Sequence, residues 1–131
     1  MKLILLVLMA LNASAYNLSD VVDKLIIIES NGDSKAIGDN GRAVGSLQIW
    51  KIMVDEANRL TKGKINFKYS DRLSERKSRQ IAMVFLNRQI KRYYKINRKM
   101  PSDVILACSW NSGNIFKQLN QSYAKKYKEL K

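Results

Sequence analysis

A single glutamate at the end of an apolar run is the residue of this chain best suited to acid–base chemistry. Glu29 follows three isoleucines, residues 26–28, and precedes Ser30. Apolar surroundings penalise the charged form of a carboxyl group and raise its pKa. A carboxyl group that stays protonated can donate a proton to a poor leaving group. Glu29 is therefore the candidate general acid, and the alternative is a structural glutamate paired with a nearby cation.

The residue types that are missing narrow the chemistry further. The chain has no histidine and one cysteine, Cys108. Serine–histidine and cysteine–histidine nucleophiles and the usual zinc sites are thereby excluded, and no intrachain disulfide can form. Cys108 lies in an apolar stretch and is interpreted as a small buried residue. No metal or organic cofactor is implied, so acid–base chemistry falls to carboxyl groups.

Two further polar motifs follow Glu29 in the chain. Gly45-Ser46-Leu47-Gln48 comes after a turn-rich segment, and Trp110-Asn111-Ser112-Gly113 ends an apolar one. The amides of Gln48 and Asn111 suit either a binding cleft or a helix cap, and serines at helix ends are most often structural. Aromatic rings such as Trp50 and Trp110 can stack on sugars, although aromatic residues at helical spacing more often belong to a core.

The order of these motifs resembles the lysozyme-like superfamily. It is most similar to the soluble lytic transglycosylase (SLT) type domain, in a small, single-domain, exported member. That family shows Glu-Ser, then Gly-x-x-Gln, then Asn-x-Gly after an aromatic residue, and the likeness spans about residues 18–116. The resemblance implies a mainly α, lysozyme-like fold with a small loop or β-hairpin over a catalytic cleft. The third motif departs from the family's Ala-Tyr-Asn-Ala-Gly, because Trp110 stands where a tyrosine is usual.

The resemblance also implies a reaction. It makes the chain a peptidoglycan-cleaving muramidase, a lytic transglycosylase that cuts the MurNAc–GlcNAc β-1,4 bond with one catalytic glutamate, Glu29. The alternative is a lysozyme-type hydrolase that uses Glu29 and a second acid, for which Asp39 is the candidate. Ala43 and Val44 occupy the position just before the second motif where such an acid stands in the families that use one, and this favours transglycosylation. The residues expected to line the cleft are Ser30, Ser46, Gln48, Trp110 and Asn111.

Helices must position these motifs. The first is expected to begin with Ser19 as its N-cap and to end at residues 31–33. A turn-rich loop or hairpin over residues 34–44 should fold over Glu29, and a helix should span residues 48–60. The remaining expectations are a central core helix capped by Asp71 or Ser74, a buried helix capped by Ser102, and a last helix on which Ile115, Leu119, Tyr123 and Tyr127 lie four apart.

The start of the chain has the pattern of an export signal. Residues 1–15 comprise a short basic start, an apolar run and a small-residue cleavage pattern, so the catalytic domain is expected over residues 16–131, in the periplasm or outside the cell. The apolar run is too short for a stable membrane span. The net charge of +13 favours an anionic cell wall as partner over nucleic acid. Family analogy adds a secretion or conjugation apparatus as a candidate partner, and a monomer is expected. The non-enzymatic alternative is a secreted cationic wall-binding or toxin-like module.

Overall fold

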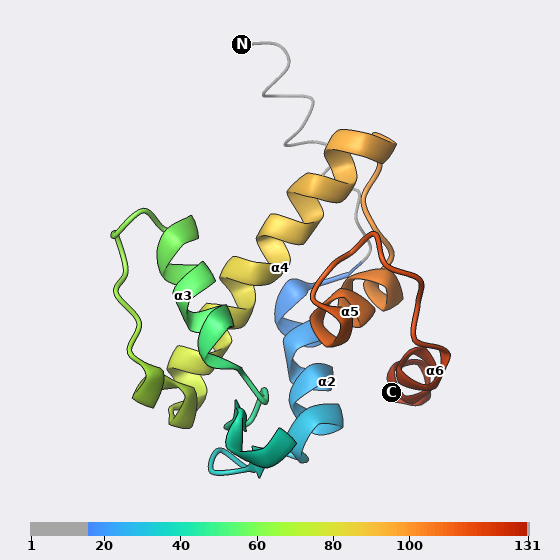
Figure 1. The fold of residues 1–131 in the computed structure, drawn as a ribbon. Helices are drawn as coiled ribbons and strands as arrows, with labels where there is room; N and C mark the ends of the chain where they lie inside the picture. The colour runs from blue at the N-terminus through green and yellow to red at the C-terminus, as the bar shows by residue number, and fades with distance from the viewer. Residues whose placement is uncertain (1–15, 131) are drawn as a thin grey trace.

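The computed structural model describes residues 16–130, and the expected signal segment, residues 1–15, lies outside that range. The described chain is mainly α-helical, as predicted (Figure 1). Its α-helices are α2 (Leu18–Ser30), α3 (Lys51–Leu60), α4 (Glu75–Asn97), α5 (Asp103–Ser112) and α6 (Gln121–Glu129). Two short strands, β1 (Ile37–Gly38) and β2 (Ala43–Val44), and two 3-10 helices, η1 (Asp39–Gly41) and η2 (Tyr69–Leu73), complete it. Among these residues no helix is both long enough and apolar enough to cross a bilayer.

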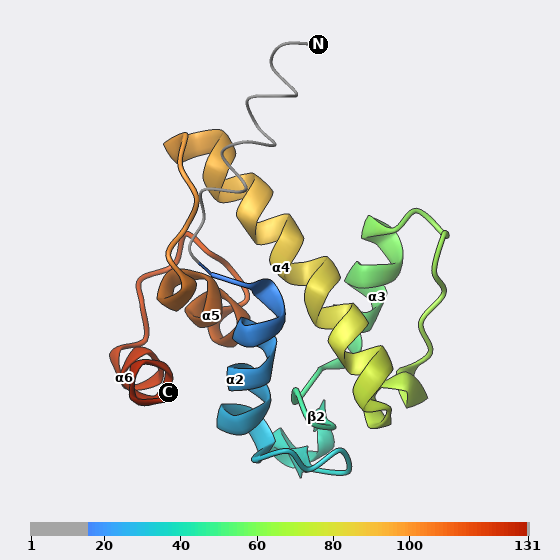
Figure 2. The same cartoon turned by 180° about the vertical axis from the view of Figure 1, so that it is seen from behind.

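Helix α4 is the centre of the fold, as its periodicity predicted. It runs through the molecule with α3 on one side and α2, α5 and α6 on the other (Figures 1 and 2). Its buried side chains recur at helical spacing, because one face of the helix must leave water. They are Ser78, Ile81, Ala82, Phe85, Leu86 and Gln89. The rings of Phe85 and of Trp110 from α5 form an edge-to-face pair, with ring centroids 5.3 Å apart. Cys108 is buried in the same core, as expected.

Two of the predicted helix caps are confirmed. The Ser74 hydroxyl accepts a hydrogen bond from the Lys77 amide at 3.3 Å, and the Ser102 hydroxyl accepts one from the Ile105 amide at 3.2 Å. Each cap satisfies a backbone donor that the first turn of a helix leaves without a partner. These two serines therefore fix where α4 and α5 begin.

Three predicted helix boundaries are wrong. Helix α2 is capped by Asn17, whose side-chain oxygen accepts from the Ser19 amide at 2.8 Å, so Ser19 is already helical. Helix α3 begins at Lys51 and not at residue 48, because Gln48 has a left-handed φ of 52° that a helix cannot contain. Helix α6 begins at Gln121, after a loop that contains Ile115. The Ile115 amide donates to Gln89 Oε1 at 3.1 Å, so this residue is buried by a loop contact and not by helical continuity.

The turn-rich segment forms the predicted hairpin. Strands β1 and β2 pair antiparallel, with Ile37 opposite Val44, and η1 forms the turn between them. The buried guanidinium of Arg72 fastens this hairpin region to η2, since it donates to the carbonyls of Tyr69 at 2.8 Å and Ile49 at 3.2 Å. The Arg72 carbonyl accepts in turn from the Ser78 hydroxyl at 2.9 Å. Hydrogen bonds to η2 therefore connect α4 to the hairpin region.

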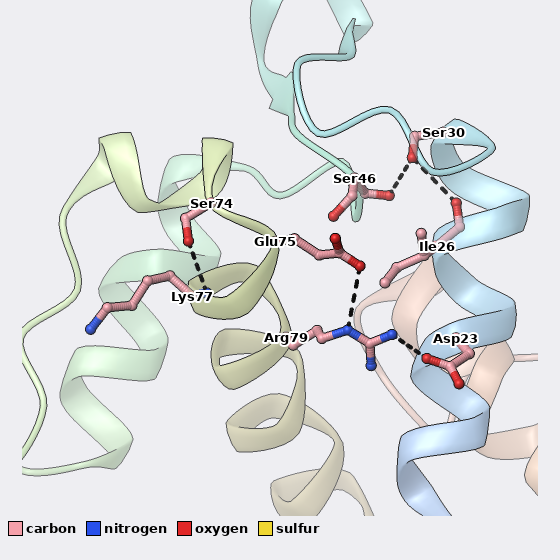
Figure 3. A network of polar contacts seen from close by, with 8 residues as sticks. All are labelled: Asp23, Ile26, Ser30, Ser46, Ser74, Glu75, Lys77 and Arg79. Atoms are coloured by element: carbon pink, nitrogen blue, oxygen red, sulfur yellow. Dashed lines mark hydrogen bonds and ion pairs between the residues drawn. The ribbon is translucent and has the colours of Figure 1, made fainter.

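A second set of polar contacts joins α2 to its neighbours (Figure 3). Arg79 of α4 forms an ion pair with Asp23 of α2, and its Nε lies 3.7 Å from the Glu75 carboxylate. At the other end of α2, the Ser30 hydroxyl donates to the Ser46 carbonyl at 2.7 Å. These contacts hold the end of α2, and thus Glu29, in a fixed position against the second motif.

Candidate active site

The three polar motifs meet at one cavity of about 520 Å³. Its wall is built from the end of α2, the hairpin, the start of α3 and the end of α5. The lining residues are Glu29, Gly38, Asp39, Gln48, Trp50, Ile52, Met53, Trp110, Asn111, Ser112 and Gly113. The hairpin thus forms one wall of the cavity that contains the Glu29 carboxyl group, as the sequence predicted.

The Glu29 carboxyl group is partly buried and has a raised pKa. Burial is the largest cause, because it removes water from the charged form. A hydrogen bond from the Tyr123 hydroxyl to Oε1, at 2.9 Å, acts in the opposite direction. The negative charge of Asp39 raises this pKa further, and the positive charge of Lys126 lowers it. The net effect holds a larger share of Glu29 protonated near neutral pH, which suits a proton donor.

Tyr123 is a site residue that sequence reasoning missed. It lies on α6, 94 residues from Glu29, and its spacing from Tyr127 predicted only a core position. Burial and the neighbouring Glu29 raise the pKa of its hydroxyl, which therefore stays protonated and able to donate. A tyrosine hydroxyl thus reaches the candidate acid from α6 and not from position 110. No local sequence signal pairs these two residues, because only the packing of α6 on α2 joins them.

Gln48 lines the cavity and also stabilises its wall. Its side-chain nitrogen donates to the carbonyls of Ala36 at 3.2 Å and Gly45 at 3.0 Å. Its Oε1 packs against Gly38, where a Cβ atom would lie only 2.4 Å away. The glutamine of the second motif and the glycine of the hairpin are therefore complementary in shape.

Of the other residues predicted to line the cleft, Asn111 and Trp110 do so, and Ser30 and Ser46 do not. Asn111 is exposed on the cavity wall, where its Oδ1 accepts from Asn120 at 3.3 Å. Trp110 also lines the cavity but is 6% exposed, and its indole nitrogen donates to the Leu47 carbonyl at 3.2 Å. Ser30 and Ser46 are not on the wall, since the Ser30 hydroxyl is bonded to the backbone of the buried Ser46. These two serines support the cavity from behind.

Two further residues of the cavity wall are suited to a role in the site: Asp39 as a second carboxyl group and Trp50 as an aromatic contact for a sugar. Asp39 is exposed at the turn of the hairpin and lies close enough for its charge to affect the Glu29 carboxyl group. Trp50 is 38% exposed, and the Arg42 guanidinium lies 4.8 Å from its ring centroid. A partly exposed aromatic ring on a cavity wall can stack on a sugar ring. Among residues 16–130, no group of histidine, cysteine, aspartate and glutamate side chains could hold a metal ion.

Comparison with protein families shows which family the chain that forms this cavity belongs to. The model of the family described as "Transglycosylase SLT domain" matches residues 8–131. The chain belongs to the SLT transglycosylase family. The resemblance drawn from the motif order is thereby confirmed, and this SLT domain is a peptidoglycan-degrading enzyme. The interpretation as a non-enzymatic wall-binding module therefore no longer applies. No curated protein and no solved structure matched the chain.

Substitution Tyr123→Phe is expected to shift the pH dependence of this SLT enzyme. The lost hydrogen bond favours the charged form of Glu29, so its removal raises the Glu29 pKa and moves the alkaline limb of the activity profile to higher pH. We expect kcat to fall about tenfold, the factor that corresponds to ~1.4 kcal/mol. The measurement is peptidoglycan cleavage as a function of pH. Tyr127→Phe on the same helix, where the hydroxyl bonds to Asp103, is the control. An unmoved alkaline limb in Tyr123→Phe would contradict the role of this hydroxyl.

Proposed function

We propose that this SLT enzyme cleaves the MurNAc–GlcNAc β-1,4 bond of peptidoglycan as a lytic transglycosylase, with Glu29 as its one catalytic carboxyl group. The observation that carries the proposal is the partly buried Glu29 carboxyl group of raised pKa, which faces a cavity of about 520 Å³. A protonated carboxyl group at that position meets the requirement for leaving-group protonation.

The proposed reaction uses Glu29 twice. Its carboxyl group first gives a proton to the glycosidic oxygen as the bond to the muramic acid carbon breaks. The resulting carboxylate then accepts the proton of the substrate's own 6-hydroxyl group, whose oxygen closes the 1,6-anhydro ring. The acid is thereby restored and no water is consumed. The Tyr123 hydroxyl, 2.9 Å from Oε1, stabilises the carboxylate that exists between the two steps.

Hydrolysis with Asp39 as the second acid is the other candidate reaction. The observation in its favour is that Asp39 lines the same cavity and its charge raises the pKa of Glu29. In that reaction Asp39 would act as nucleophile or would activate a water molecule, and the product would carry an ordinary reducing end.

Product analysis of purified peptidoglycan distinguishes the two reactions. Transglycosylation is expected to leave 1,6-anhydromuramoyl ends, which mass spectrometry detects as the loss of one water relative to the reducing form. Asp39→Asn is expected to retain these ends, with activity within about tenfold of wild type. Its alkaline limb should move to lower pH, because the charge that raises the Glu29 pKa has been removed. Reducing ends as the sole product, together with a loss of about 10²-fold or more in Asp39→Asn, would establish hydrolysis instead.

The proposed place of action is outside the cytoplasm, as a monomer working on the glycan strands of the wall. The export pattern of residues 1–15 supports this placement, and a net charge of +13 draws the protein to anionic wall material. A small exported wall-cutting enzyme suits the opening of a passage for a secretion or conjugation apparatus, an extension that rests on analogy.

A further inference from the structure

Two more cavities continue the active-site cavity along α4. The second, of about 330 Å³, shares Ile52, Met53 and Gly113 with the first. The third, also about 330 Å³, shares Arg88 and Arg92 with the second but no lining residue with the first. A long ligand can therefore extend from Glu29 towards the C-terminal half of α4.

The third cavity is strongly basic. It is lined by four cations, Arg88, Lys91, Arg92 and Lys95, and by the apolar side chains of Ile96 and Phe116. Within residues 16–130 the ion pairs involve Arg59 and Arg79 and none of these four cations, although the charge of Arg88 lowers the pKa of Glu56 in the second cavity. Cations outside any ion pair, as Lys91, Arg92 and Lys95 are among the described residues, are complementary to an anionic part of a substrate.

Arg92 is held in place where the second and third cavities join. Its guanidinium lies 5.3 Å from the ring centroid of Phe116, and its Nη1 lies 3.4 Å from Gln89 Oε1. Gln89 is 3% exposed, and the same oxygen accepts from the Ile115 amide at 3.1 Å. A buried amide and an aromatic face thus orient the guanidinium before a ligand arrives, which lowers the entropy cost of binding an anion.

We propose that this basic cavity binds the carboxylates of a peptidoglycan stem peptide, so that the enzyme recognises strands that still carry their peptides. The inference rests on the proposed function, which places the sugar strand at Glu29. The sugar rings of peptidoglycan present neutral hydroxyl and acetamido groups, whereas the stem peptides carry several carboxylates beside aliphatic side chains. Peptide-free strands carry carboxylates too, but only on the lactyl group close to each ring. The third cavity, which does not border the Glu29 cavity, suits the more distant groups.

Equilibrium binding to a Glu29→Gln protein tests this assignment without any turnover. Three soluble ligands of equal length serve as probes: stem-bearing glycan fragments, peptide-free fragments with lactyl carboxylates, and chitin oligosaccharides without carboxylates. The combined substitution Lys91→Gln and Lys95→Gln removes two exposed charges of the cavity. It is expected to weaken binding of the stem-bearing fragment roughly five- to tenfold at low salt, and of the other two ligands less than about twofold.

A matched variant separates the cavity from net charge. Lys125→Gln with Lys128→Gln removes the same charge from exposed positions on α6 that line none of these cavities, and its binding should equal that of the parent. Arg92→Gln, checked for folding by its melting temperature, should weaken binding of the stem-bearing fragment by at least as much as Lys91→Gln with Lys95→Gln does. The proposal would be overturned if the α6 variant bound the stem-bearing fragment as weakly as the α4 variant (Lys91→Gln with Lys95→Gln) does. It would also be overturned if the α4 variant lost as much affinity for peptide-free fragments as for stem-bearing ones, or if it lost no affinity at all. Failure of the proposed function is distinct, because it would appear as missing 1,6-anhydromuramoyl ends with the wild-type enzyme.

Discussion

Replacement of Glu29 by glutamine is expected to reduce peptidoglycan cleavage by about 10³-fold or more, within the range that general acid catalysis contributes. Glutamine keeps the shape of the side chain and can still accept the hydrogen bond from Tyr123, but it carries no proton that a glycosidic oxygen can take. The measurement is the release of soluble fragments from purified peptidoglycan under single-turnover conditions.

The same substitution is expected to stabilise the fold at neutral pH. The Glu29 pKa is higher in the folded protein than in the unfolded chain, so the folded state binds the proton more tightly. Below the unfolded pKa both states are neutral, and no difference between the variants is expected. As the pH rises through the folded pKa, the wild type bears the cost of charging a partly buried group, whereas the glutamine variant does not. Thermal melts across pH should therefore show a Tm advantage for Glu29→Gln that grows from acid to neutral pH.

Glu129→Gln is the control for both expectations. Glu129 is exposed at the end of α6 and lines none of the three cavities, so its substitution should alter neither cleavage nor the pH dependence of Tm. Substantial cleavage by Glu29→Gln would remove Glu29 from the role of acid. A Tm advantage that is independent of pH would show that the stabilisation has a cause other than the Glu29 carboxyl group.

The sequence could predict the parts of the site that local signals specify. The apolar run before Glu29 predicted a partly buried carboxyl group, and the carboxyl group is partly buried with a raised pKa, although Ile27 of that run is itself exposed. The serines that cap α4 and α5 act within one helical turn. The motif order then predicted that separate helix ends and the hairpin would meet at one cavity, and the Transglycosylase SLT domain match confirms the family.

The parts that could not be predicted depend on contacts between distant segments. Tyr123 reaches Glu29 only because α6 packs beside α2, and the four-residue spacing of the last segment pointed to a helix that starts too early. Ile115 fits that spacing but is buried through a bond to Gln89, 26 residues away. The left-handed conformation of Gln48 likewise follows from the bridge between Val44 and Ile49, which ends the hairpin before α3 begins. Periodicity alone cannot show where tertiary contacts interrupt a helix.

Gly45→Ala is expected to lower the free energy of unfolding by about 3 kcal/mol or more. Gly45 has φ +85°, a region in which a side chain is strained, and its backbone packs directly against η2. A Cβ atom here would lie 1.8 Å from the Arg72 carbonyl oxygen and 2.9 Å from its carbonyl carbon. Relief of the clash requires the hairpin and η2 to move apart. Any movement of η2 also displaces the Arg72 carbonyl, which accepts a hydrogen bond from Ser78. The glycine of the second motif is thus required by the close approach of two backbones.

Gly32→Ala separates this clash from backbone strain. Gly32 has nearly the same φ of +86°, but a Cβ atom there would have no atom within 4 Å apart from those of Gly32 and its two chain neighbours. It should therefore lose only the ~1 kcal/mol that positive φ costs an alanine. Urea unfolding of both variants gives the comparison, and equal losses would refute the contact between Gly45 and η2 as the cause. Because Gln48 donates to the Gly45 carbonyl and packs against Gly38, displacement of Gly45 also moves the part of the cavity wall that Gln48 and Gly38 form. Gly45→Ala should consequently lose activity at temperatures where it remains folded, whereas Gly32→Ala should not.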